Sequence, residues 1–267
     1  IATFNVQNMR LRQNAGGPRL EGARDRDAGS PEDRKLDIID RKLTAEIIAT
    51  IDADILCLQE VFDTATIDHF HDAFLLPTGL RPYPHRICKA GNDGYGLNVA
   101  VMARVRPDHA RSHAQLTATD LGLKDPDNVL RGGPVFRRDC LEVRFGTFTL
   151  FACHLKAPYP DQRRAAKIRG IEAKAIRRVI ETSLEHPNRQ FWMILGDLNT
   201  PIGANAGRDD ALAPLLDGFC VDLMARMPNG EAWTYVMPDT GQHLRPDGML
   251  ASPALAQRAG DAMPRIE

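Results

Sequence analysis

Excess charge of one sign, aromatic rings and long apolar runs are all scarce in this chain of 267 residues. The net charge is −1, which excludes the strong basic field of a protein that holds nucleic acid by phosphate neutralisation alone. Aromatic residues make up only 6%, so few rings are available to stack on bases. We find no apolar stretch of membrane-spanning length and expect no transmembrane segment.

Cysteine is also sparse, and its placement argues against a disulfide scaffold. The five cysteines are an odd number, lie beside apolar residues and lack close metal-ligand spacing, so we expect buried free thiols. Free thiols favour a cytoplasmic, reducing location. We also expect a monomer. Export stays open, because the chain opens on Ile1 without an initiator Met and an upstream signal can have been removed.

Apolar residues, at 43%, and charged residues, at 26%, are present in globular proportions, so we expect a substantial core. The length suits one domain over residues 1–267, since domains run from roughly 50 to 250 residues. Residues 10–34 and 104–134 are rich in Gly, Pro and charge and predict loops, the first a solvated surface or a substrate lid. Residues 244–250 predict a short or edge strand interrupted by Pro246.

Hydrophobic periodicity predicts the helices and strands. Apolar steps of three and four predict a helix over 36–51 that buries Leu36, Ile39, Leu43, Ile47 and Ile51, and a second over 163–182. Helices and hairpins in mixed order around two sets of strands predict an α/β (α+β) sandwich. Besides a helix over 63–75, the expected elements are strands at 1–6, 54–59, 83–88, 97–103, 135–144, 147–154 and 191–196, the 135–144 and 147–154 pair forming a hairpin that turns at 145–146.

Polar side chains end several of these apolar runs. Glu60 and His154 each close a strand-like run, and buried strands commonly carry ligand-binding groups at such ends. Glu60 and Asp197 are carboxylates, and Asn5 and Asn199 add amide oxygens; hard oxygen ligands of this kind select Mg²⁺, with Mn²⁺ as the alternative. Each residue alone has a plainer explanation, because a strand-end carboxylate is as often a helix N-cap as a ligand and a lone histidine is as often packed in the core.

The conjunction of these motifs resembles a known family. Thr-Phe-Asn-Val at 3–6, Leu-Gln-Glu-Val at 58–61, Cys-His-Leu at 153–155 and Gly-Asp-Leu-Asn at 196–199 resemble, in this order, the signature of the endonuclease/exonuclease/phosphatase superfamily. The resemblance implies the deoxyribonuclease I-like fold, a four-layer α/β/β/α sandwich with two mixed sheets. It also implies metal-dependent phosphoester hydrolysis by direct water attack.

The resemblance assigns roles by position. Asn5 and Glu60 would sit at the metal, Asp197 would orient the attacking water, and Asn199 would hold that water or the phosphate. His154 would contact the scissile phosphate or protonate the leaving group. The remaining residues that the resemblance assigns are Asp247, which would orient a second catalytic histidine, and Asn98, which would line the site. Apart from the resemblance, we expect Arg163 and Arg164 on the solvated face of their helix, with binding of a phosphate as the alternative because they lie nearest the end of the His154 strand.

Two departures from the family pattern stand out. Gly248 follows Asp247 where the family usually has His, and no closing Ser-Asp-His motif follows Asp247. We therefore expect a domain that lacks its final C-terminal strand and motif.

Three functions remain open. The first is a Mg²⁺-dependent phosphodiesterase or nuclease; the second is a phosphomonoesterase acting on a sugar, inositol or lipid phosphate. The third is an inactive relative that binds phosphate. A nuclease should add exposed aromatic or basic loop residues, whereas we expect Trp192, Trp233 and Tyr235 to lie in the core.

Overall fold

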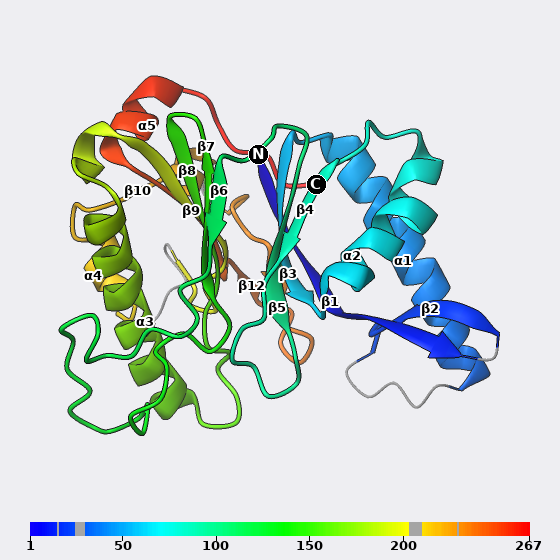
Figure 1. The fold of residues 1–267 in the computed structure, drawn as a ribbon, viewed down its shortest axis with the longest axis horizontal. Helices are drawn as coiled ribbons and strands as arrows, with labels where there is room; N and C mark the ends of the chain where they lie inside the picture. The colour runs from blue at the N-terminus through cyan, green and yellow to red at the C-terminus, as the bar shows by residue number, and fades with distance from the viewer. Residues whose placement is uncertain (15, 25–29, 203–209, 229) are drawn as a thin grey trace. The chain divides into compact units, whose positions relative to one another are not determined.

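The computed structural model describes residues 1–14, 16–24, 30–202, 210–228 and 230–267. The chain divides into two compact units, residues 1–107 with Glu267 and residues 108–266. Each unit contains one large mixed β-sheet with helices on one face (Figure 1). The predicted fold class, two mixed sheets with flanking helices, is confirmed.

The first unit holds a five-stranded sheet in the order β2-β1-β3-β5-β4. β1 (Ala2–Asn14) runs parallel to β3 (Ile55–Val61), and the other pairs are antiparallel. β2 (Gly17–Glu21), β4 (His85–Cys88) and β5 (Asn98–Ala103) complete the sheet. Helices α1 (Pro31–Ile51) and α2 (Thr64–Phe70) cover one face, and α2 continues into a π-helical turn over His71–Leu75.

The second unit holds a six-stranded sheet in the order β10-β13-β9-β8-β7-β6. β8 (Phe148–His154) runs parallel to β9 (Phe191–Asp197), and the other pairs are antiparallel. α3 (Gln162–Ser183) packs its predicted apolar face into the core of this unit. The other elements are β6 (His109–Arg111), β7 (Cys140–Phe145), α4 (Ala213–Leu216), β10 (Val221–Asp222), β11 (Tyr235–Val236), β12 (His243–Leu244), β13 (Asp247–Ala251) and α5 (Pro253–Ala259).

The predicted loop at 10–34 is wrong over much of its length. β1 continues to Asn14 and pairs with β2 in a hairpin, in which Leu11 lies opposite the buried Leu20. Gly17 therefore lies in a strand, with a φ of 99° that favours glycine. Residues 15 and 25–29 of the predicted loop lie outside the described residues. α1 also begins earlier, because Ser30 and Asp33 form a capping box around its first turn.

The predicted buried face of α1 is also wrong. Ile39 and Leu43 are 45% and 55% exposed, whereas Arg41 is buried. The Arg41 guanidinium donates to the carbonyls of Val6, Gln7 and Glu21 at 2.6 to 2.9 Å. Gln7 has a positive φ and interrupts the β1 ladder, so these carbonyls need a donor that an apolar helix face cannot supply.

Smaller corrections concern the second unit. The 104–134 region contains β6, and β7 begins only at Cys140 because the backbone N–H of Arg137 donates to a helix side chain instead of a strand. The β7–β8 turn lies at residues 146–147, since Phe145 pairs with Phe148. β13 is no edge strand, because it pairs with both β9 and β10.

The other predicted strands and helices are confirmed within a few residues. None of the five cysteines, all of which the structure describes, forms a disulfide, and all but the half-buried Cys88 are buried. No helix among the described residues is long and apolar enough to cross a membrane.

Candidate functional site

In the first unit, a backbone irregularity brings Asn5 and Glu60 together. The β1–β3 register breaks after Asn5, and Glu60 sits in a bulge of β3 with a φ of 66°. A non-glycine residue in this region is strained, and such strain is common at functional sites. Asn5 Nδ2 donates to Glu60 Oε1 at 3.2 Å, and the backbone N–H of Asn8 donates to Oε2 at 2.9 Å.

The Asn5 and Glu60 pair has the chemistry of a magnesium ligand set. Both side chains are partly exposed and offer only hard oxygen atoms for coordination. No group of three or more His, Cys, Asp or Glu side chains in the described part of the chain is arranged to hold a metal. Octahedral Mg²⁺ does not require such a group, because one or two carboxylates suffice and water or phosphate fills the other positions. The residues therefore fit Mg²⁺.

Asn98, at the start of β5, uses its amide to fix backbone. Its Nδ2 donates to the carbonyls of Phe62 and Gly96 at 2.6 and 3.1 Å, and its Oδ1 accepts from Gly91 N–H at 2.7 Å. Asn98 thereby ties the loop before β5 to the residue that follows β3. Its expected role in lining the site stays a prediction.

In the second unit, three predicted residues lie side by side across neighbouring strands. In the sheet register His154 of β8 pairs with Asp197 of β9, and Asp197 pairs with Asp247 of β13. His154 Nε2 lies 3.6 Å from Asp197 Oδ2, and Asp197 Oδ1 accepts the backbone N–H of Asn199 at 2.8 Å. The sheet thus places an imidazole, two carboxylates and an amide at one strand end.

The surroundings of His154 favour the neutral form of its ring. Burial lowers its pKa well below the ordinary value, and the positive charges of Arg138 and Lys156 lower it further. Its Nδ1 has no hydrogen-bond partner within the described ranges. A neutral ring supplies one N–H donor and one acceptor, which suits contact with a phosphate oxygen better than proton donation.

Asn199 and Asp247 are each held by one further contact. Asn199 has a φ of 50°, and its Nδ2 donates to the Leu155 carbonyl at 3.1 Å. Asp247 Oδ2 accepts the Thr234 hydroxyl at 2.5 Å. Burial raises the pKa of Asp247, while the Thr234 hydrogen bond and the charge of Arg245 act against the rise.

The glycine at 248 has a packing reason. A side chain at Gly248 would collide with the Leu198 side chain, which is fully buried between the site residues Asp197 and Asn199. The histidine of the family pattern could not be accommodated here without moving this leucine.

Arg163 and Arg164 lie in the first turn of α3, which Asp161 caps. Arg164 Nη2 donates to the Val129 carbonyl at 2.9 Å and so holds the loop before β7, whereas Arg163 is exposed. Their expected binding of phosphate stays a prediction.

Several residues around this site carried no sequence signal. Arg138 and Thr234 lie in loops and act on His154 and Asp247 from a distance along the chain. Lys156 could have been found, since it directly follows the Cys-His-Leu motif.

Of the three aromatic rings expected in the core, only Trp192 is buried. Trp233 is 37% exposed and stacks on His243 with 4.2 Å between ring centroids, and Tyr235 is 45% exposed.

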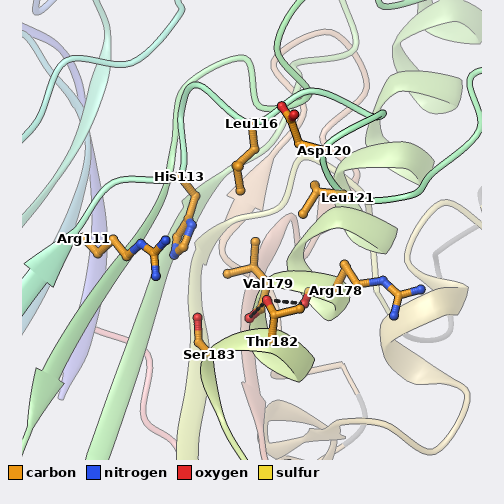
Figure 2. Close-up of a pocket in the computed structure, with 9 residues that line it drawn as sticks. All are labelled: Arg111, His113, Leu116, Asp120, Leu121, Arg178, Val179, Thr182 and Ser183. Atoms are coloured by element: carbon orange, nitrogen blue, oxygen red, sulfur yellow. Dashed lines mark hydrogen bonds between the residues drawn. The ribbon is translucent and has the colours of Figure 1, made fainter.

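A cavity of about 310 Å³ lies elsewhere in the second unit, between the segment that follows β6 and the last turns of α3. Figure 2 shows Arg111 beside His113 on one wall and Ser183 below. His113 Nε2 and Ser183 Oγ both lie 2.9 Å from Glu142 Oε2. None of the predicted site residues lines this cavity.

Comparison with known proteins identifies relatives. A family model described as "Endonuclease/Exonuclease/phosphatase family" matches residues 2–265. No curated protein matches the sequence.

Solved structures share the fold. An AP endonuclease from Archaeoglobus fulgidus is 16% identical with a TM-score of 0.55, over 82% of this chain and 83% of that one. A family protein from Leptotrichia buccalis is 16% identical, with a TM-score of 0.52 over 80% and 81% of the two chains. Truncated Caenorhabditis elegans TDP2 is 19% identical, with a TM-score of 0.51 over 79% of this chain and 75% of that one.

Proposed function

The chain belongs to the endonuclease/exonuclease/phosphatase family, and we propose on this basis that it is a Mg²⁺-dependent phosphodiesterase, with nucleic acid as the favoured substrate class. Family membership makes it a phosphoester hydrolase by class, and enzymes of the family generally use a divalent metal ion. The observation that carries the proposal is the row His154, Asp197 and Asp247 on three adjacent strands, with Asn199 bonded to the central carboxylate.

We propose that Asn5 and Glu60 serve the same reaction as this row. The support is that one family model spans residues 2–265 and therefore both sets. Glu60 and Asn5 would hold the ion through oxygen atoms, and when bound it would polarise the phosphoryl group and stabilise the leaving oxyanion.

The remaining steps fall to residues of the second unit. Asp197 accepts a proton from the attacking water, and the Asn199 N–H, bonded to Oδ1 at 2.8 Å, holds its carboxylate in place. Neutral His154 donates a hydrogen bond to a phosphate oxygen, and the Asn199 amide binds the same group or the water. Asp247, held by the Thr234 hydroxyl, supplies the second carboxylate of the row.

Exposed aromatic side chains support a nucleic acid substrate. Trp233 stacks on His243 and precedes Thr234, which bonds Asp247, so a ring pair lies on the segment that contacts the row. Base stacking on such rings is tolerant of sequence and contributes about 1 to 3 kcal/mol per base. Monoester hydrolysis stays the alternative, because no contact among the described residues excludes a terminal phosphate.

The test is hydrolysis by the full chain of a generic diester, bis-p-nitrophenyl phosphate, beside the monoester p-nitrophenyl phosphate. We expect diester cleavage that EDTA abolishes, that Mg²⁺ or Mn²⁺ restores, and that Glu60→Gln removes. Glu46→Gln, an exposed carboxylate on α1, is the matched control and should retain full activity. Monoester preference would support the phosphatase instead, and metal binding without turnover of either substrate would indicate an inactive phosphate binder.

A further inference from the structure

A carboxylate is completely buried in the middle of α3. Glu172 is 0% exposed and faces the core among apolar neighbours of the helix, where an ionisable side chain is costly unless it is bonded. Its two oxygens accept backbone N–H groups from two separate segments. Oε1 accepts from Arg137, before β7, at 3.0 Å, and Oε2 accepts from Lys156, after β8, at 2.8 Å.

Two buried arginines hold the same stretch of backbone. Arg169, one turn before Glu172 on α3, donates to the Lys156 carbonyl at 3.0 Å and is 2% exposed. Arg138 donates to the Leu155 carbonyl at 3.1 Å. Helix α3 therefore binds both the N–H and the C=O of Lys156 through side chains.

The candidate site holds this stretch from its other side. The Leu155 N–H donates to the Asp197 carbonyl at 2.9 Å, and the Leu155 carbonyl accepts Asn199 Nδ2 at 3.1 Å. Leu155 directly follows His154. A displacement of residues 155–156 would therefore move the His154 ring and the Asn199 amide together.

We propose that Glu172 is a positioning residue, which fixes the backbone of residues 155–156 and through it the placement of His154 and Asn199. The proposal rests on the proposed function, since it assigns those two residues to the reaction. Packing alone does not call for a carboxylate at 172, because the neighbouring positions of α3 already provide an apolar face, including Ile168, Ile176 and Ile180. An apolar residue at 172 would leave two backbone N–H groups without an acceptor.

The test compares Glu172→Gln with Glu142→Gln. Both positions are buried glutamates of the second unit, but Glu142 bonds His109 and two residues that line the cavity, His113 and Ser183. Glu172→Gln keeps the shape and turns an amide N–H₂ toward one backbone N–H. We expect its kcat on the diester to fall about 10- to 100-fold with KM within about twofold, because small misplacements of reacting groups cost that much. Glu142→Gln should lower Tm and leave kcat within about twofold.

A double variant that combines Glu172→Gln with Asn199→Ala separates a positioning role from general destabilisation. In an Asn199→Ala background, Glu172→Gln should cost clearly less than it does in the native chain, because the two substitutions disturb one unit. If Glu172→Gln instead lowers only Tm, or if its effect is fully additive with Asn199→Ala, the positioning role is wrong. Arg169→Lys, which disturbs the same Lys156 carbonyl with charge retained, provides a second variant should Glu172→Gln fail to fold.

A measurement that does not depend on activity distinguishes a failure of the positioning role from a failure of the proposed function. The imidazole ¹H–¹⁵N resonances of His154 should shift in Glu172→Gln and stay in place in Glu142→Gln. If the native chain hydrolyses no phosphoester while this shift is seen, the proposed function fails and the positioning contact stands. If the resonances do not move, the positioning role fails whatever the activity.

Discussion

At the scale of single residues, Asp197 is the centre of the candidate site. It pairs in register with Asp247, lies 3.6 Å from His154 Nε2 and accepts the Asn199 N–H. It is 9% exposed, so its carboxylate is partly desolvated and its field acts on nearby groups with little screening. We propose this carboxylate as the base for the attacking water.

We predict that Asp197→Asn lowers kcat about 10²- to 10⁴-fold, the usual contribution of a general base. The fold should be retained, because the amide oxygen can still accept the Asn199 N–H. The measurement is steady-state hydrolysis of the diester with Tm in parallel. Asp239→Asn, at an exposed aspartate, is the control, and equal activity of the two variants would contradict the role of Asp197.

Thr234 offers a finer test of the same row. Its hydroxyl bond helps to lower the pKa of Asp247 against burial, so Thr234→Val should raise that pKa. The acid limb of the kcat/KM profile should then move to higher pH, and kcat/KM should fall about 10-fold, as for other supporting contacts. An unchanged pH profile would show that Asp247 does not titrate in the reaction.

At the scale of elements, α1 shows how local backbone decides which helix face is buried. Its side chains at Asp37 and Arg41 face the sheet, while Ile38, Ile39 and Leu43 are exposed. The interrupted β1 strand requires hydrogen-bond donors for its carbonyls, and Arg41 supplies them. The helix therefore turns its Arg41 face to the sheet, because a buried carbonyl left without a donor costs about 1 to 3 kcal/mol.

This arrangement predicts that a charge placed at an aliphatic position of the predicted core face of α1 is tolerated, whereas shortening a side chain on the observed buried face is costly. Ile39→Lys should change the free energy of unfolding by no more than about 0.5 kcal/mol, because the side chain is already in water. Ile48→Ala should cost about 2 to 4 kcal/mol, since Ile48 is 1% exposed. Urea denaturation of both variants is the measurement. A larger loss for Ile39→Lys than for Ile48→Ala would restore the face that the periodicity predicts.

At the scale of the whole molecule, the net charge of −1 does not show that titratable side chains are buried in the cores. Such groups make the stability of the fold depend on pH. Glu142 is the clearest case. Burial acts to raise its pKa, but hydrogen bonds from His113, Ser183 and His109 prevail and bring it from 4.5 to about 2. Because the folded pKa is the lower one, the carboxylate contributes stability above the unfolded pKa and loses it on acidification.

We therefore predict that unfolding becomes easier as pH falls from about 4.5 to about 2, with Glu142 as a contributor. Glu142→Gln should flatten this part of the profile, because the amide does not titrate, and should lower stability at pH 7 by about 1 to 3 kcal/mol. Denaturant midpoints across this pH range are the measurement. A variant with the same acid dependence as the native chain would rule out the contribution of Glu142.

The sequence by itself determined the family, the fold class and most strand and helix positions, because these follow from local periodicity and from motifs that are contiguous along the chain. It also indicated His154, Asp197 and Asn199, since each closes an apolar run, and the resemblance to the family indicated Asp247. Only the sheet decided that His154, Asp197 and Asp247 lie side by side in one row, because strand pairing joins residues far apart in sequence. The buried face of α1, the β1–β2 hairpin and the Glu172 contacts were likewise decided in three dimensions. In each case buried backbone N–H and C=O groups need hydrogen-bond partners, and hydrophobic periodicity does not show this need. The side chains and strands that supply these partners come from distant parts of the chain.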